Sequence, residues 1–361
     1  MGNALSHSSK TGAVAVALLA TTCSPPVKHP ETPVAIRIVA TERGGAGGRL
    51  VVIDEAGDRR AVLVPAAVTT ARDNSAAFSP DGAWIAFASS RTRDLARTSI
   101  WVAPAVIGGE PLRITDDAAD DLAPVWTPDG GALVFASDRG GSFDLWQIAL
   151  TRDGDRLRAG ALTQLTHAPG AELAPTVARD GRIAFAAIDR DESGGLRSRI
   201  AVLDQGEPRM ITLGPGDGTP AWSPDGKAIA FSAPMAREGG GVDSDLLAVA
   251  PDGSDRRVLV EGPDTDESGP VWSADGRWLF ATSLYRQVAT GKPLLSSVVY
   301  ADLREQPPTL RMLKDRIGAV SRLAPALGPG ALDPQALHAA PEYRQTLRQI
   351  LVHALSQSPD P

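Results

Sequence analysis

The chain has little cysteine and little histidine, and both shortages exclude kinds of site. It contains one cysteine and five histidines in 361 residues. A single cysteine cannot form a disulfide within the chain. Only His167 lies between residues 34 and 330, so the body of the chain cannot supply the several histidines of a multi-histidine metal centre.

Several catalytic and binding motifs are also missing. The sequence has no G-x-S-x-G nucleophile motif, no P-loop and no G-x-G-x-x-G that opens a helix. These absences exclude the hydrolases and nucleotide-binding folds that depend on those motifs. The net charge is -7 and no basic stripe is present, so nucleic acid is not an expected partner. No apolar run is long enough for a membrane-spanning helix.

What the sequence does contain is a five-residue phrase that ends in Asp-Gly and recurs at spacings of 48, 51, 45 and 50 residues. The copies are FSPDG at 78–82, WTPDG at 126–130, VARDG at 177–181, WSPDG at 222–226 and WSADG at 272–276. Pro presets φ, Asp bonds nearby backbone and Gly accepts positive φ, so the phrase predicts a tight turn. A fixed period of this length is typical of propellers and solenoids.

Each phrase lies among four short runs rich in β-branched and aromatic residues, such as 84–87 and 100–102. Such runs, bounded by turn residues, predict strands. Four antiparallel strands every 45 residues or so predict a propeller blade. Residues 34–64 supply only three strands, and residues 321–328 repeat the pattern of a first strand. We therefore expect an all-β, six-bladed β-propeller of four-stranded antiparallel blades over residues 34–330, closed by a C-terminal strand.

The repeat resembles that of the TolB-type β-propellers, most closely in residues 121–150 (DLAPVWTPDGGALVFASDRGGSFDLWQIAL). The resemblance extends over about residues 34–330 and concerns the propeller alone. TolB carries an α/β domain before its propeller, and residues 1–33 are too few to hold one. The resemblance implies the fold and suggests a binding role in the bacterial cell envelope, although folds of this kind host many unrelated functions.

The N-terminal segment predicts export. Residues 1–23 combine a polar start, a short apolar run and small residues before Cys23, as in a secretory signal. A lone cysteine at that position resembles a bacterial lipobox, so we expect Cys23 to be lipidated and the protein to be a periplasmic or outer-membrane-associated lipoprotein. Plain cleaved export and an incidental cysteine are the alternatives. Residues 24–33 form a Pro-rich tether.

The C-terminal tail, residues 331–361, contains a second predicted element. Apolar side chains recur at spacings of three and four within 342–356, which predicts a short amphipathic helix. The helix either packs on the outside of the propeller or docks a partner.

Acidic residues gather in the links between blades, which share one side of the predicted ring. Hard oxygen ligands from such loops could hold Ca²⁺, and the alternative is solvated loop charge without any cofactor. The calcium candidates are Asp116, Asp117, Asp120, Asp121, Asp264, Asp266 and Glu267, with Glu172, Asp217 and Glu261 in similar positions.

Arginines follow the second strand of each predicted blade and open onto the same side as the acidic links. The set is Arg43, Arg91, Arg139, Arg190, Arg237 and Arg286, with Tyr285 beside the last. The guanidinium fork suits carboxylates. The arginines either pair with neighbouring acidic links or form a binding face for an acidic partner.

Three functions are compatible with these patterns. The first is a non-enzymatic cell-envelope module that docks a protein or glycan partner through its loop-rich face. The second is a metal-dependent hydrolase or lyase with a carboxylate-lined site at the propeller pore. The third is a purely structural envelope component. Because catalytic motifs are missing and the variable links lie on one face, the first is the leading hypothesis.

Overall fold

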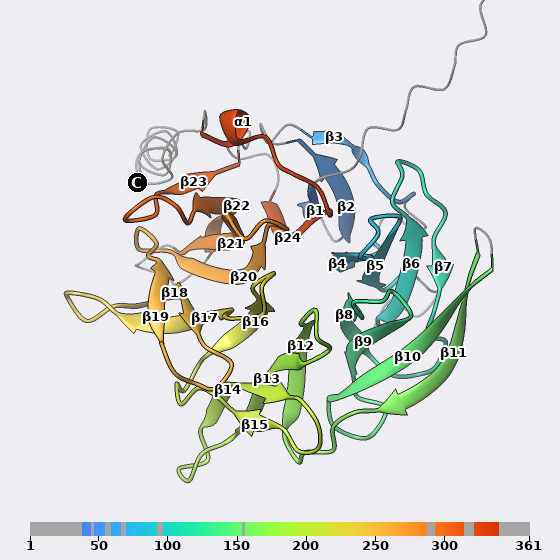
Figure 1. Cartoon of the computed structure of the whole chain (residues 1–361), viewed down its shortest axis with the longest axis horizontal. Helices are drawn as coiled ribbons and strands as arrows, with labels where there is room; N and C mark the ends of the chain where they lie inside the picture. Colours follow the sequence, from blue (N-terminus) through green and yellow to red (C-terminus); the bar gives the residue numbers. More distant parts are fainter. Residues whose placement is uncertain are drawn as a thin grey trace, which may run out of the picture. The chain divides into compact units, whose positions relative to one another are not determined.

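The computed structural model describes residues 38–44, 47–54, 59–65, 70–91, 97–153, 156–286, 293–313 and 321–338. All of them belong to one compact unit, residues 35–361. They form six four-stranded antiparallel sheets, which Figure 1 shows as blades arranged in a ring. The prediction of an all-β, six-bladed propeller is confirmed. Within the described residues, no helix is long and apolar enough to cross a membrane.

The strands of the first three blades, from the centre of the ring outward (Figure 1), are as follows. Blade 1 contains β24 (Ser321–Leu327), β1 (Ile38–Gly44), β2 (Gly47–Ile53) and β3 (Arg59–Val62). Blade 2 contains β4 (Asp73–Phe78), β5 (Trp84–Ser89), β6 (Ser99–Pro104) and β7 (Leu112–Arg113). Blade 3 contains β8 (Asp121–Trp126), β9 (Ala132–Ser137), β10 (Asp144–Asp153) and β11 (Arg156–Gln164).

The other three blades repeat the arrangement. Blade 4 contains β12 (Ala171–Val177), β13 (Ile183–Arg190), β14 (Leu196–Leu203) and β15 (Arg209–Met210). Blade 5 contains β16 (Gly218–Trp222), β17 (Ile229–Ala236), β18 (Val242–Val249) and β19 (Arg257–Val260). Blade 6 contains β20 (Asp266–Trp272), β21 (Trp278–Arg286), β22 (Pro293–Asp302) and β23 (Leu310–Met312).

The recurring phrase forms the turn between the first and second strand of a blade. In blade 2, the Ser79 hydroxyl donates to Asp81 Oδ1 at 2.6 Å and accepts from the backbone N–H of Trp84 at 2.9 Å. Gly82 closes the turn at φ 71°, a conformation that costs glycine little. The same contacts recur at Ser223 and Ser273, so the phrase is a structural device of the fold.

The core lies between neighbouring blades. The apolar run after each turn places one phenylalanine on the second strand, and all five are fully buried: Phe87, Phe135, Phe185, Phe231 and Phe280. Each apolar cluster draws residues from two adjacent blades, as when Trp84 of blade 2 packs with Trp126 of blade 3. A single blade cannot bury both of its faces, so the ring is the unit that folds.

Blade 1 joins strands from the two ends of the propeller. β24 pairs antiparallel with β1, and the chain then enters α1 (Pro334–His338). Leu337 is fully buried in the core between blades 6 and 1, and its carbonyl oxygen accepts a hydrogen bond from Tyr300 Oη at 2.7 Å. The predicted helix at 342–356 lies outside the described residues, as do the predicted signal, Cys23 and tether.

Candidate functional site

The ring has two chemically different sides. The loop face carries the links between the second and third strands and the links between blades. The turn face carries the Asp-Gly turns. Both the acidic links and the predicted arginines open onto the loop face.

In five of the blades, a buried carboxylate lies on the loop face, where the first strand of the blade begins. These residues are Asp73, Asp121, Glu172, Asp217 and Glu267, all 2% exposed or less. Two residues further on, each strand has a residue at positive φ: Ser75, Ala123, Ala174, Thr219 and Gly269. The pairing register shifts at the same places, so a β-bulge follows each acid. The repeated bulge gives the five acids equivalent positions.

In blades 2 and 3, arginine neutralises the buried acid. Arg91 Nη2 lies 2.7 Å from Asp73 Oδ2, and both side chains are 2% exposed. Arg139 Nη2 lies 2.7 Å from Asp121 Oδ1, and its Nη1 lies 3.0 Å from Asp117 Oδ2. Burial raises the pKa of Asp121, although hydrogen bonds from Ser137, Thr115 and Arg139 oppose the rise. Arg91 and Arg139, both predicted from the sequence, therefore stabilise blades 2 and 3 through internal ion pairs.

Arg237 of blade 5 binds three carboxylates. Its guanidinium lies 2.6 Å from Asp243, 2.6 Å from Asp245 and 2.9 Å from Glu261. Asp243 and Asp245 stand on β18, whereas Glu261 follows β19 and begins the link to blade 6. Burial raises the pKa of Asp245, and its contacts with Gly262 and Arg237 oppose that effect. Arg237 thus joins its own hairpin to the next inter-blade link.

Glu172 and Glu267 have no arginine partner among the described residues. Glu172 accepts a hydrogen bond from Thr166 at 3.0 Å, and burial, together with the nearby Asp144, raises its pKa to about 7. Glu267 accepts from Thr265 at 2.6 Å and Ser283 at 2.8 Å, and burial raises its pKa to about 8. At neutral pH, Glu267 is therefore mostly protonated.

The raised pKa of the Glu267 carboxyl predicts that the stability of the protein depends on pH. The pKa of Glu267 is about 8 in the folded chain against an ordinary value of 4.5 for glutamate, so between these values the folded state holds a proton that the unfolded state has lost. Stability therefore falls as pH rises through this window and levels off above it. Glu267→Gln keeps the shape without the charge. We expect its stability relative to wild type to rise between pH 5 and pH 9, by at most a few kcal/mol, as measured by urea denaturation. A pH-independent difference would contradict the assignment.

Most of the calcium candidates are engaged with protein donors. Asp116 pairs with Arg113, and Asp120 Oδ1 accepts from the backbone N–H of Thr98 at 2.8 Å. Asp264 is exposed at φ 58° and Asp266 is half-buried. Within the described ranges, none of these acids belongs to a group of three potential metal ligands whose atoms lie within 4.8 Å of one another.

The remaining predicted face residues lie in different surroundings. Arg190 is exposed, and its Nη1 donates to the carbonyl oxygen of Gly194 at 2.8 Å. Tyr285 is half-buried and packs against the apolar core between blades 5 and 6. The side chain of Arg286 lies outside the described part of the chain. The structure therefore does not bring together, as a single surface, the predicted arginines whose side chains it describes.

A pocket of about 230 Å³ lies on the loop face between blades 1 and 2. It is lined by Thr41, Arg43, Gly47, Gly48, Arg72, Asp73 and Asn74. Arg43 and Arg72 are exposed, and neither guanidinium forms an ion pair with any residue that the structure describes. Arg43 was predicted from the sequence. Arg72, Thr41 and Asn74 were missed, because no motif marks a pocket that two blades build jointly.

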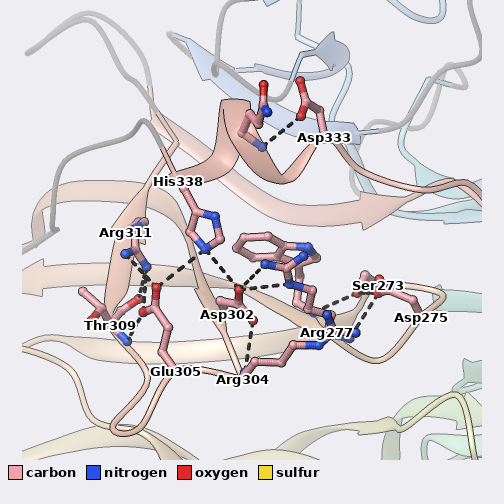
Figure 2. Close-up of polar contacts among 12 residues, drawn as sticks. Ser273, Asp275, Arg277, Asp302, Arg304, Glu305, Thr309, Arg311, Asp333 and His338 are labelled. Carbon is pink, nitrogen blue, oxygen red and sulfur yellow. Dashed lines mark hydrogen bonds and ion pairs between the residues drawn. The ribbon is translucent and has the colours of Figure 1, made fainter.

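A polar cluster that sequence reasoning missed lies on the turn face (Figure 2). His338 Nε2 lies 3.1 Å from Asp302 Oδ2 and 3.6 Å from Glu305 Oε1. Its ring also contacts Trp278, with ring centroids 5.1 Å apart. Asp302 is 36 residues from His338 in sequence, and only the docking of α1 beside β22 brings them together.

Two arginines complete this turn-face cluster. Arg277 Nη2 lies 2.7 Å from Asp302 Oδ2, and Arg311 Nη2 lies 2.9 Å from Glu305 Oε1. Burial would raise the pKa of Asp302, but hydrogen bonds from Arg277 and the Arg304 backbone leave it lowered. Asp302, Glu305 and His338 have the residue types and spacing of a metal site. However, the two guanidiniums already balance both carboxylates, so the cluster acts as the anchor of α1.

Comparisons with known proteins agree with this fold. Residues 55–276 match the family model described as TolB beta propeller domain. The chain is 26% identical over 235 residues to the uncharacterized protein Atu1656 of Agrobacterium fabrum, covering 63% of this chain and 76% of that protein. It is 27% identical over 179 residues to the uncharacterized peptidase YuxL of Bacillus subtilis, covering 45% of this chain but only 22% of the peptidase.

A solved structure from Agrobacterium tumefaciens, provisionally named TolB, also matches. The TM-score is 0.54 at 17% identity, covering 77% of this chain and 89% of that chain. At this identity, the likeness concerns the fold alone.

Proposed function

The chain belongs to the TolB beta propeller family, and from this premise we propose that it is a non-enzymatic binding module that docks a protein partner through its loop face. The family resemblance predicted from the turn phrase is confirmed by the match over residues 55–276. We further propose that the module works in the cell envelope of a bacterium. The export signal and lipidation of Cys23 remain predictions from the sequence.

One observation carries the proposal: exposed positive charge remains at the blade 1–blade 2 pocket in a chain of net charge -7. Arg91, Arg139 and Arg237 are held by carboxylates of their own or neighbouring strands. Arg43 and Arg72 are paired with no carboxylate of the described residues, and they line a concave site. Arginine outside internal ion pairs and beside a pocket is typical of protein-binding surfaces.

The turn face is a weaker candidate for the docking surface than the loop face. Its turns repeat nearly the same contacts from blade to blade, so they offer little that distinguishes one partner from another. The links of the loop face differ in length and composition, and variable loops on a rigid scaffold commonly carry function. The competing proposal of a pore enzyme would need convergent carboxylates ready to hold a metal, whereas Asp73, Asp121 and Asp217 are already paired with arginines.

Site-specific photocrosslinking in cells that produce the protein tests the proposal. A photoreactive residue at Thr70, exposed beside the pocket, is compared with one at Asp204, exposed on the turn-face link between β14 and β15. We expect one discrete crosslinked protein from Thr70, and its loss in the double variant Arg43→Ala/Arg72→Ala. Equal crosslinking from both positions would contradict a loop-face partner, as would no discrete product from Thr70.

A further inference from the structure

The pocket between blades 1 and 2 has a more specific chemistry than a general docking surface. We propose that it binds a carboxylate, namely a glutamate or aspartate side chain of an acidic peptide segment. The inference deepens the proposed function and rests on it, since it names the chemical group by which the partner is held.

The first argument is local charge. Two carboxylates around the pocket are already neutralised: Asp73 by Arg91 at 2.7 Å and Glu42 by Arg49 at 2.7 Å. Arg43 and Arg72 are additional to these pairs. The pocket therefore carries positive charge that no carboxylate in the described part of the chain balances, and two guanidiniums provide planar donor pairs that match the two oxygens of a carboxylate.

The second argument is independent of charge and concerns Thr41. This residue also lines the pocket and is 2% exposed. Its hydroxyl has no hydrogen-bond partner among the residues that the structure describes. A buried hydroxyl without a partner costs free energy, about 1–3 kcal/mol in mutational data. This donor belongs to a residue that lines the pocket, so an acceptor that reached it would remove that cost.

The third argument is shape. The backbone N–H of Gly48 donates to the carbonyl oxygen of Ala71 at 2.9 Å, and a parallel bridge joins Gly48 to Arg72. A Cβ at position 48 would lie 3.3 Å from the carbonyl oxygen of Asp73 and 3.6 Å from Thr41 Cγ2. Because residue 48 is a glycine, no side chain fills the pocket where blades 1 and 2 meet. At about 230 Å³, the pocket is smaller than sites for drug-sized ligands and suits one small anionic group.

Titration of the full chain with short blocked peptides tests the proposal. The probes are acetyl-Gly-Glu-Gly-amide, its Gln counterpart and inorganic phosphate at matched ionic strength. The readout is the set of backbone amide NMR signals of Gly47, Gly48 and Asn74. We expect saturable shifts with the Glu peptide that weaken with added salt, and none with the Gln peptide. Equal responses to both peptides, or a response to phosphate alone, would overturn the carboxylate assignment.

Variants assign the binding to named side chains. Arg72→Gln and Arg43→Gln should each weaken the binding of the Glu peptide at least tenfold, because each substitution removes a charge-assisted contact. Thr41→Val, which keeps the shape without the hydroxyl, should weaken it about fivefold or more. Arg190→Gln, an exposed loop-face arginine outside the pocket, is the matched control and should bind as wild type. Unchanged binding in the Arg72 and Thr41 variants would refute the site.

The two proposals fail separately. If the Thr70 crosslink forms and survives in the double arginine variant while the Glu peptide does not bind, the loop face docks a partner by other contacts and the carboxylate site is wrong. If the peptide binds but no crosslinked protein forms in cells, the carboxylate site stands and the protein-docking function is wrong.

Discussion

Truncation of the chain after Leu313 is expected to abolish cooperative folding of the ring. The cut removes β24, which supplies the fourth strand of blade 1. It also removes Leu332 and Leu337 from the core between blades 6 and 1. Each fully buried leucine contributes about 2 kcal/mol, and the loss leaves β1 as a free edge that invites aggregation. The measurements are thermal unfolding followed by circular dichroism, and size-exclusion chromatography.

A second truncation, after His338, provides the matched control. It keeps β24 and α1 together with the contacts of Tyr300 and Asp302. We expect this shorter chain to elute as a compact particle with an unfolding midpoint close to that of the full chain. If the chain that ends at Leu313 behaves in the same way, then the C-terminal strand does not maintain the ring.

Substitution of Arg91 by methionine is expected to lower the free energy of unfolding by about 3–5 kcal/mol. The Arg91 and Asp73 side chains are both 2% exposed, so removing the guanidinium leaves a carboxylate buried without its cation. Methionine preserves much of the packing of the Arg91 side chain on Phe87 and Trp101. The expected loss of stability therefore measures the effect of the missing charge more than that of the missing side-chain volume. Urea denaturation at neutral pH measures it.

Two further variants check this interpretation. The double variant Arg91→Met/Asp73→Asn removes both charges and should recover part of the lost stability, since replacing a whole buried pair costs less than breaking it. Arg43→Met, at an exposed arginine of the same face, should leave stability nearly unchanged. A large loss in Arg43→Met with a small loss in Arg91→Met would reverse the roles assigned here to the two arginines.

The fold could be predicted from the sequence because its determinants are local. Each Asp-Gly phrase fixes a turn through its own side chains, as Ser79 and Asp81 show. The following apolar run then places a buried phenylalanine such as Phe87 four or five residues after the glycine of the phrase. Five similar local signals gave five of the six blades, and the sixth followed from the strand patterns at 34–64 and 321–328.

The site could be predicted only in part because its determinants are not local. The sequence placed Arg43 and Arg91 in one class, since both follow a second strand. Their environments differ because Asp73, which binds Arg91, precedes a bulge whose position depends on strand pairing. Thr41 and Arg72 come from separate blades, and His338 reaches Asp302 only after α1 has docked. No periodic pattern in the sequence predicts such contacts between distant residues.

The pairing of β24 with β1 also sets an order of events during protein synthesis. β1 ends at Gly44, whereas its partner begins at Ser321. At a translation rate of about 5–20 residues per second, ~15–55 s pass between the appearance of the two strands. Throughout that interval, the first blade to leave the ribosome has no inner strand to pair with. The nascent chain is therefore most exposed to misassociation at its earliest blade, and a chaperone that covers β1 until translation ends would aid this propeller most.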